Sequence, residues 1–505
     1  MNQDQPLGDL LYRGQYFAGA KPFPAESWLQ QTLPDGMVLS THPALEVTHG
    51  EENGFSVILL GFMLDPFNTT HSNAEIIARL SRENATTTAW IEATATLGGR
   101  WIVFLYRGDE AIVFNDAGGM RTVFYHIDEQ QQLWLGAQPG LFSKMFGFTP
   151  SAEAEAHMAD PRYREKAEAW FPGNSSIYRE VVLMQPNHLI DLNSKSVRRY
   201  WPTRKIRRYT KAEAVPALAQ LLKVIAPAAH HRAPWAPGPT SAVDSREVLA
   251  ACRDFAGELY IYTLLYRALT PDSDDPKVAR QICDRLGLEH HLLDAREPMC
   301  SGFEELYREH TTGIKDDWCP LLFAKFSHIP AETLLMKGMA SEIYRCRYWL
   351  SGDYPYRVDL RYLVEKARMG EDPLVWDKFR AWMQDALVVE DHGYKLLDIF
   401  SWENETGHWL AFGSNVSDLT HTEFTPLNCR RYIEIMLGTD PKLRIGKGCK
   451  LQAEVTRALW PELAEFPYTP SRAEAPVNRI KGSLRHWLQG INYWLFKEKH
   501  GRLEK

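Results

Sequence analysis

The chain has 505 residues, enough for two domains, because single hydrophobic cores rarely grow beyond about 250–300 residues. Its hydrophobic fraction of 45% and charged fraction of 24% are typical of a globular protein, and its net charge of −7 argues against a nucleic-acid surface. Seven cysteines without a Cys-x-x-Cys motif argue against a disulfide framework or a zinc ribbon. We find no run of about 18 apolar residues, so we expect a cytoplasmic protein without a membrane span.

The first part of the chain, residues 1–202, is rich in short runs of β-branched and aromatic residues between turn signals. These runs predict an antiparallel sheet domain, an α+β sandwich, with strands at 55–62, 101–106, 111–114, 133–135 and 188–192. Helices are expected near 73–97 and 152–170. The basic and polar segment 203–215 reads as a linker.

The second part, residues 216–505, alternates strand and helix patterns, which predicts a parallel-sheet α/β domain with a helical C-terminal portion. We expect a helix at 212–228, a strand at 258–266 and a helix from Asp274. Segment 233–239 is a poor strand, because prolines cannot complete a ladder. The basic, aromatic tail at 479–500 suggests a packed amphipathic helix.

A loop of small residues leads into a helix at 239–252. Asp244 and Glu247 have the spacing of a capping box, which predicts that the helix starts at Asp244. A helix N-terminus after such a loop attracts anions, because its backbone N–H groups and dipole point outward. An ordinary capped helix is the alternative.

Several motifs, in order, resemble the asparagine synthetase family. Residues 240–245 (Thr-Ser-Ala-Val-Asp-Ser) are similar to its pyrophosphate loop, Ser/Thr-Gly-Gly-x-Asp-Ser, and residues 337–342 (Lys-Gly-Met-Ala-Ser-Glu) to its Ser-Gly-x-Gly-Ser-Asp/Glu motif. Residues 97–106 resemble its Gly-x-Phe-Ala-Phe strand, and 115–125 its Asp-x-x-Gly-x-Arg-Pro-Leu-Tyr-Tyr turn. The resemblance covers roughly 50–490 and implies an Ntn glutaminase-like domain followed by an ATP-pyrophosphatase domain of the adenine nucleotide α-hydrolase type.

The resemblance implies no glutaminase activity. A working Ntn glutaminase needs Cys directly after the initiator Met, whereas Asn2 stands there and the first cysteine is Cys252. The family's β-lactam and carbapenam synthetases and its lasso-peptide cyclases also lack that cysteine. We therefore expect a structural N-terminal domain.

What the resemblance implies for activity is an ATP-dependent, amide-bond-forming synthetase. It would adenylate a small-molecule or peptide carboxylate, release pyrophosphate, and let ammonia or another amine displace AMP. The implied cofactors are ATP and Mg²⁺; a homodimer is left open.

The resemblance also assigns residues to this chemistry. The phosphate-binding positions are Thr240, Ser241, Asp244, Ser245, Gly338 and Ser341, and the adenine lies near Tyr262 and Thr263. Asp244 and Glu342 match the Mg²⁺ carboxylates, with helix capping as the alternative. The catalytic cation is Lys447 or Lys450, with ordinary surface lysines as the alternative.

Three positions depart from the family pattern. Ser241 and Ala242 replace two glycines of the phosphate loop, and Ala340 replaces the second glycine of the other motif. Met339 stands where β-lactam-forming relatives carry a catalytic tyrosine, which disfavours that cyclisation. These changes leave open a second hypothesis, a catalytically silent relative that serves as a binding or scaffold subunit, whereas the joint survival of Thr240, Asp244, Ser245 and Glu342 favours the synthetase.

Overall fold

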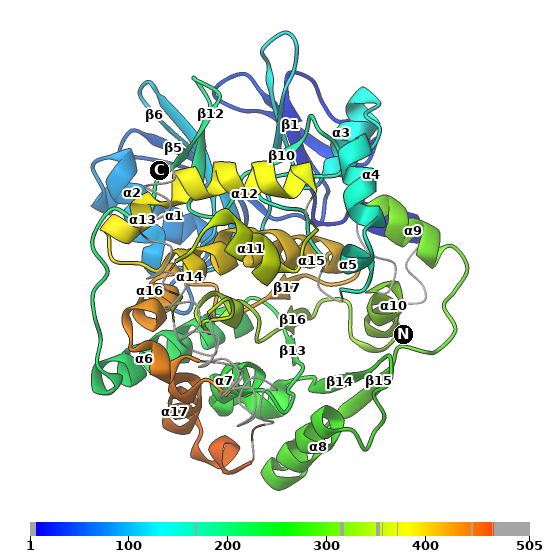
Figure 1. Ribbon diagram of the computed structural model, residues 1–505, viewed down its shortest axis with the longest axis vertical. Coiled ribbons are helices and arrows are strands. Elements are labelled where there is room, and N and C mark those ends of the chain that lie inside the picture. The colour runs from blue at the N-terminus through cyan, green and yellow to red at the C-terminus, as the bar shows by residue number, and fades with distance from the viewer. Residues whose placement is uncertain are drawn as a thin grey trace, which may run out of the picture.

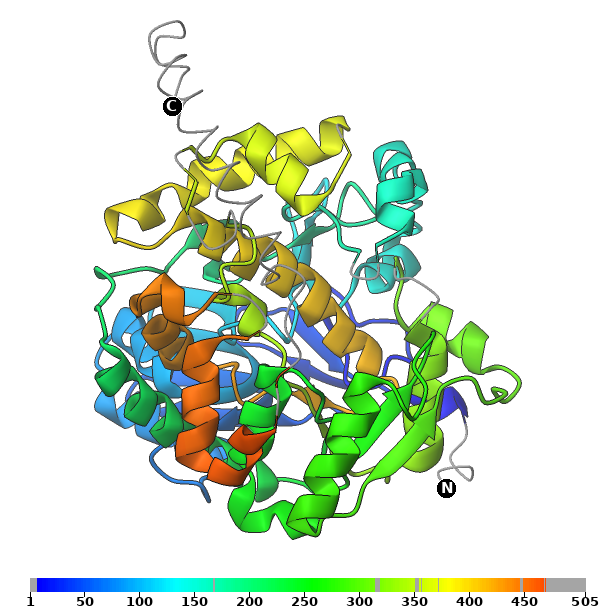
Figure 2. The ribbon, with the colours of Figure 1, turned by 60° about the horizontal axis from the view of Figure 1, so that its bottom comes forward.

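The computed structural model describes residues 7–166, 169–313, 318–349, 354–355, 357–370, 372–445, 448–466 and 468 (Figures 1 and 2). In Figure 1 the antiparallel strands of the N-terminal part occupy the upper half, and the parallel strands of the second part lie below them. The basic tail at 479–500 and the position of Asn2 lie outside the described residues.

Two six-stranded antiparallel sheets form the N-terminal part. The first has the order β10-β8-β9-β1-β3-β2, with bounds β1 Tyr16–Gly19, β2 Leu29–Thr32, β3 Val38–Thr41, β8 Phe124–Ile127, β9 Leu133–Gly136 and β10 Val182–Leu183. The second has the order β12-β11-β7-β6-β5-β4, with bounds β4 Val47–Glu52, β5 Phe55–Leu64, β6 Gly98–Arg107, β7 Glu110–Asn115, β11 His188–Asp191 and β12 Ser196–Arg199.

Strand β5 shows how the sandwich is built, because both faces of its sheet are buried. Ile58 and Leu60 pack in the core that also contains Phe17 and Leu135 of the first sheet. Val57 and its alternate neighbours pack in a second core with α1 (Asn73–Glu83) and α2 (Thr87–Ala93). The expected antiparallel α+β sandwich is confirmed.

The expected helices of this part are shorter than the patterns predicted. Segment 73–97 contains α1 and α2, because α1 stops at Asn84 and Thr86 caps a new helix. Segment 152–170 begins as α4 (Ala152–Ala159) and α5 (Pro161–Arg164), since Asp160 ends one and caps the other.

Five parallel strands form the centre of the second part. Their bounds are β13 Trp235–Pro237, β14 Tyr262–Leu265, β15 His291–Asp294, β16 Leu334–Met336 and β17 Glu423–Phe424. β16 pairs with β13 and β17, and β14 pairs with β15. A backbone hydrogen bond of 3.0 Å from the Tyr260 N–H to the Trp235 carbonyl joins β13 to the segment leading into β14. The strands thus form a three-stranded sheet, β13-β16-β17, and a two-stranded sheet, β14-β15, which this bond places side by side with β14 next to β13.

The prediction that 233–239 is unsuited to a strand was wrong. A proline lacks only the donor, and its carbonyl still accepts: the Leu334 N–H donates to the Pro234 carbonyl at 2.9 Å. Trp235, fully buried, anchors the short strand in the core.

Helices surround these strands and make up most of the chain after them. They are α6 Lys211–His230, α7 Val243–Ala250, α8 Asp274–Leu286, α9 Phe303–His310, α10 Cys319–His328, α11 Leu360–Ala367, α12 Pro373–Ala386, α13 Val388–Asp391, α14 Leu396–Phe400, α15 Ala411–Ser417, α16 Arg430–Gly438 and α17 Lys450–Leu459. Helix α3 (Pro139–Phe146) instead packs on β9 of the N-terminal sandwich. A π-helical segment, Ser401–Leu410, connects α14 to α15. The mixed α/β class and the helical C-terminal portion are confirmed.

One helix of the described chain, α6, is long and apolar enough to cross a membrane by length and composition alone. Leu218 and Leu222 on it are fully buried in the protein core, and α17 lies beside it in both ribbon views (Figures 1 and 2). Packing in the core therefore accounts for its apolar composition. The cytoplasmic location remains a prediction.

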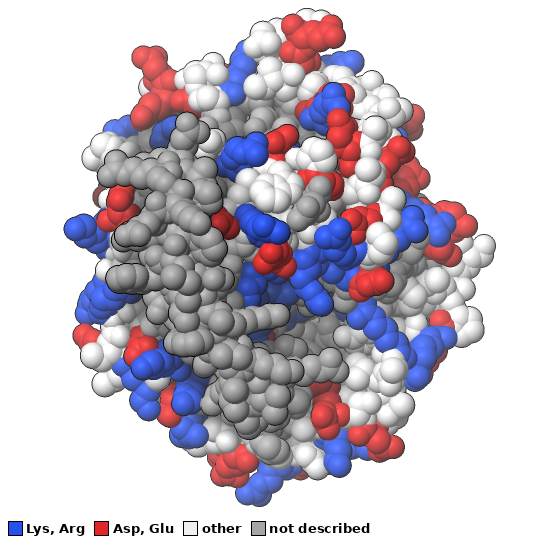
Figure 3. Space-filling model, in the orientation of Figure 1, with Lys and Arg blue, Asp and Glu red and all other residues white. Residues whose placement is uncertain are grey.

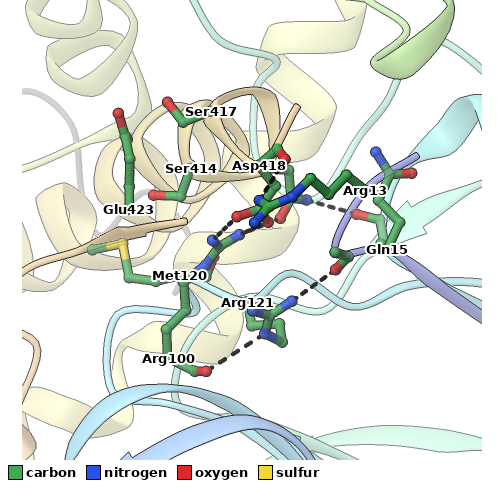
Figure 4. Close-up of polar contacts among 12 residues, drawn as sticks. Arg13, Gln15, Arg100, Met120, Arg121, Ser414, Ser417, Asp418 and Glu423 are labelled. Carbon is green, nitrogen blue, oxygen red and sulfur yellow. Dashed lines mark hydrogen bonds and ion pairs between the residues drawn. The ribbon is translucent and has the colours of Figure 1, made fainter. Parts of the chain in front are cut away.

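A buried ion pair joins the N-terminal sandwich to the second part of the chain (Figure 4). Arg100 of β6 donates two hydrogen bonds to the Asp418 carboxylate at 2.6 and 2.7 Å, and a third to Asn415 at 2.8 Å. Both members of the pair are 1% exposed. Nearby, Asn428 donates to the Asp116 carboxylate and the Gly99 carbonyl. Buried hydrogen bonds and an ion pair therefore connect the N-terminal sandwich to the second part of the chain, and each of these buried polar groups has its partner on the other side.

Candidate functional site

A cavity of about 430 Å³ lies at the carboxyl ends of β13, β14 and β16. The strand order reverses between β13 and β16. After β13 the chain adds β14 and then β15 on one side, and after β16 it adds β17 on the other side. Open parallel sheets bind ligands at such a point, because the loops leave the two strands in opposite directions. The cavity is lined by polar and charged residues, including Thr240, Asp244, Ser245, Thr263, Lys325 and Lys337, and by aromatic and apolar residues, including Tyr262, Met339, Trp318 and Trp409.

The structure places the residues expected at a nucleotide site as follows. Thr240, Asp244, Ser245, Tyr262, Thr263 and Gly338 all line the cavity, whereas Ser241, Ser341 and Glu342 lie outside its lining. Tyr262 is buried, and the hydroxyl of Thr263 lies 3.0 Å from Nε2 of His290.

The phosphate-loop candidate is held in shape by its own side chains. Ser245 Oγ accepts a hydrogen bond from the Thr240 N–H at 2.9 Å, and Thr240 Oγ1 accepts one from the Ala242 N–H at 3.1 Å. The Ser241 N–H donates to the Asp275 carboxylate at 2.9 Å. Three backbone donors of the loop are therefore already bonded, and a phosphate that binds them must displace these partners.

Helix α7 starts at Val243 with Ala242 as its N-cap, so the predicted capping by Asp244 was wrong. Asp244 instead lies in the first turn, and its carboxylate accepts a hydrogen bond from the Ser341 hydroxyl at 2.9 Å. Glu247 does not complete a capping box, because its side chain is fully buried beneath the helix.

The backbone explains where glycine is dispensable and where it is required. Neither Ser241 nor Ala242 has a positive φ, so neither loop position needs glycine. Ala340 has φ 78°, a left-handed conformation in which an alanine is strained. A Cβ on Gly338 would lie 2.6 Å from the backbone nitrogen of Ser245, so that glycine permits close packing of the loop after β16 on α7.

A single arginine bridges the two carboxylates expected to hold Mg²⁺. Arg345 Nη1 lies 3.2 Å from Asp244 Oδ2, and Arg345 also bonds to Glu342. Burial raises the pKa of Asp244 against the opposing effect of Arg345. Burial also acts to raise the pKa of Glu342, but Arg345 and Arg347 lower it overall.

This arrangement does not fit an ion held by both carboxylates. The Arg345 guanidinium occupies the position between them, and only Oε2 of Glu342 is buried without a partner. Among the described residues there is no group of three or more His, Cys, Asp or Glu that could hold a metal ion. We derive no chemical step from Mg²⁺ bound at this pair.

Two lysines that sequence reasoning missed supply positive charge to the cavity. Lys325 of α10 and Lys337 after β16 both contact the Glu423 carboxylate, at 3.1 and 2.5 Å. Burial lowers the pKa of Lys337. Burial acts to raise the pKa of Glu423, but Lys337 and Lys325 lower it to about 2. Two ammonium groups on one carboxylate leave a net positive charge at the cavity wall.

The two lysines expected from the sequence do not take this place. Lys450 is exposed at the first position of α17 and is not part of the cavity lining, and Lys447 lies outside the described residues. The sequence did contain one indication that Lys337 lies in the cavity, because this lysine directly follows an apolar strand and precedes Gly338.

Beneath the loop, Glu247 gives a pH-dependent prediction. Burial raises its pKa to about 8, although hydrogen bonds from Tyr432 (2.5 Å) and Gln452 (2.7 Å) oppose the shift. The unfolded-state value is about 4.3. The folded protein therefore holds an extra proton, and this contribution to stability is complete below about pH 4.3 and is lost as the pH rises to about 8.

The measurement is urea unfolding of the wild type and Glu247→Gln between pH 5 and 8.5. We expect the free energy of unfolding of the wild type to fall relative to the variant up to about pH 8 and then to run parallel to it. Parallel profiles throughout this range would show that Glu247 is ionised in the folded protein.

Comparisons with known proteins were made by family model, sequence and structure. No family model matches the chain, and no curated protein matches it. One similar solved structure is an allosteric regulatory enzyme of purine biosynthesis, with TM-score 0.23, 11% identity, and coverage of 66% of this chain and 73% of that chain. Another is glutamine phosphoribosylpyrophosphate amidotransferase from B. subtilis complexed with ADP and GMP, with TM-score 0.22, 10% identity, and coverage of 66% and 71%. Similarity at these TM-scores carries no argument about fold family or function.

Proposed function

We propose that the protein is an ATP-dependent, amide-bond-forming synthetase without glutaminase activity, and that the cavity at the carboxyl ends of β13, β14 and β16 binds ATP. The observation that carries the proposal is the position of this cavity at the reversal of a parallel strand order. The order of motifs that resemble the asparagine synthetase family supports the same reading, with an Ntn-like sandwich and an ATP-pyrophosphatase domain.

In this proposal each part of the cavity has one task. Tyr262 and Thr263 face the adenine, and the hydroxyls of Thr240 and Ser245 turn from each other towards the phosphates. Lys337, beside Lys325, balances the negative charge of the carboxylate substrate and of the departing pyrophosphate.

The bond changes are those of an acyl transfer. A carboxylate oxygen of the substrate attacks the α-phosphorus of ATP, and the α–β phosphoanhydride breaks to release pyrophosphate. The nitrogen of ammonia or an amine then attacks the acyl carbon, the bond to AMP breaks, and the proton lost from nitrogen passes to solvent.

A catalytically silent binding or scaffold subunit is the second candidate. It is favoured by the Arg345 bridge between Asp244 and Glu342 and by the internal hydrogen bonds of the phosphate loop. In both features, carboxylates and backbone N–H groups that a working site would offer to a ligand are already bonded to other parts of the protein.

Calorimetric titration with ATP, with and without Mg²⁺, tests the proposal. We expect one ATP per chain, and weakening of the affinity by at least about tenfold in Lys337→Met, the value of one lost charge-assisted hydrogen bond.

Lys450→Met is the matched control, because it removes the same charge from an exposed position outside the cavity. It should bind ATP as the wild type does. If Lys450→Met loses ATP binding and Lys337→Met binds ATP like the wild type, then Lys450 and not Lys337 is the catalytic cation. An undetectable interaction of the wild type with ATP at millimolar concentration would favour the scaffold.

A further inference from the structure

A second cavity, of about 490 Å³, lies between the end of α5 and the C-terminal end of α11. It shares no lining residue with the cavity at the strand ends. Figure 3 shows Lys and Arg side chains gathered at the centre of this face, around a hollow in the region where Figure 1 places α11 and α5.

The described lining carries five cationic side chains and two carboxylates, an excess of three positive charges. Cations at the C-terminal end of a helix are common because they complement its dipole, which accounts for Lys366 and Arg368 on α11. Arg162, in the last turn of α5, is likewise at a helix C-terminus and lies 3.4 Å from Asp160. Helix dipoles do not account for Lys166 and Arg347, which reach the same cavity from other segments.

One of the two carboxylates is neutralised within the cavity wall. Glu405 is 1% exposed, and its Oε1 lies 2.6 Å from Arg347 Nη2. The buried rings of Trp170 and Tyr348 complete the inner surface, and the Lys166 ammonium lies 5.6 Å from the centre of the Trp170 ring. The cavity therefore has a buried aromatic inner wall and a cationic outer part.

Arg368 occupies a position where glycine is the usual residue. It is the C-cap of α11 and has φ 53° and ψ 38°, a left-handed conformation that is strained for a residue with a side chain and that glycine adopts freely. Two backbone carbonyls, of Glu365 and Val364, accept its N–H. A glycine would satisfy the same backbone without strain, so the arginine side chain has a reason beyond closing the helix.

We propose that this cavity binds a small molecule carrying two or more phosphate or carboxylate charges. The excess of positive charge in the lining favours a multiply charged anion, and a volume of about 490 Å³ is that of a small-molecule pocket. Arginine and lysine suit both phosphate and carboxylate, so the shared chemistry is that of a compact polyanion. The proposal does not depend on ATP binding at the strand ends.

The test uses the full-length chain and two probes, inorganic pyrophosphate and citrate, in calorimetric titrations at low salt. Arg368→Gly and Arg368→Gln remove the charge, and the glycine variant also relieves the backbone strain, so it is expected to fold at least as well as the wild type. Arg361→Gln is the matched control, because Arg361 lies on the same helix, exposed, paired with Glu365 and outside the cavity. Gly338→Ala, placed at the other cavity, separates pyrophosphate binding at the two sites.

We expect at least one probe to bind, with affinity reduced about tenfold or more in both Arg368 variants and unchanged in Arg361→Gln, whereas pyrophosphate binding that is lost in Gly338→Ala alone belongs to the other cavity. Binding of pyrophosphate alone would assign a phosphorylated ligand, and binding of citrate alone a polycarboxylate. Failure of both probes at millimolar concentration would overturn the proposal, as would binding that Arg368→Gly leaves unchanged. Binding of only a long polyanion, such as a poly-glutamate peptide, would overturn it in favour of a macromolecular partner.

Discussion

Replacing Asp418 by Ala is expected to lower the free energy of unfolding by about 3–5 kcal/mol, the largest effect of any single substitution considered. The Arg100 guanidinium is 1% exposed, and Asp418 is the only carboxylate within ion-pair distance of it among the described residues. Removing the aspartate leaves a buried cation without its counter-charge, and the energy of desolvating that cation is no longer compensated. Denaturant unfolding followed by tryptophan fluorescence measures the change.

Two further variants isolate the cause. Asp418→Leu combined with Arg100→Met removes both charges together, so it is expected to be less destabilised than Asp418→Ala. Asp377→Ala, which breaks an exposed pair with Arg380, should change stability by no more than about 0.5 kcal/mol. A loss in Asp418→Ala as small as in Asp377→Ala would show that the interface does not depend on this ion pair.

Gly338→Ala is expected to disrupt the cavity at the strand ends. The new Cβ would lie 2.6–2.8 Å from backbone atoms of Asp244 and Ser245, and backbone cannot move aside as a side chain can. The loop after β16 and the first turn of α7 must separate, at an overpacking cost of about 1–3 kcal/mol. Because both line the cavity, we expect a loss of ATP binding together with a lower melting temperature.

Gly257→Ala is the control, since a Cβ there meets nothing within 4 Å and its φ is not positive. It should leave the melting temperature and ATP binding unchanged. A Gly338→Ala protein that binds ATP like the wild type would place the nucleotide elsewhere.

The parts of the fold that the sequence predicted are those set by local chemistry. Strand β5 alternates between two buried faces, and its β-branched and aromatic residues show this directly. The helix expected at 212–228 from its apolar spacing is α6, and the structure shows that a capping box of Thr210 and Glu213, the motif that residues 244–247 do not form, sets its start. The prediction that segment 233–239 is unsuited to a strand failed because carbonyl groups, including that of Pro234, can accept the hydrogen bonds that hold a short strand such as β13.

The parts of the site that the sequence could not predict depend on tertiary structure. Lys325 and Glu423 are 98 residues apart, and they meet only because tertiary packing brings a side chain of α10 against β17. Arg345 follows the expected metal ligand by three residues, but its bridge to Asp244 spans 101 positions. Neither contact has a local spacing from which it could be inferred.

The most direct test of the proposed function is a crystal structure of the protein with α,β-methylene-ATP, a nucleotide that cannot release pyrophosphate. We expect the adenine beside Tyr262 and Thr263, the phosphates at Thr240 and Ser245, and Lys337 within hydrogen-bonding distance of a phosphate oxygen. Nucleotide bound at another place, or a cavity that stays without nucleotide at saturating concentration while Arg345 still bridges Asp244 and Glu342, would contradict the synthetase and support the scaffold.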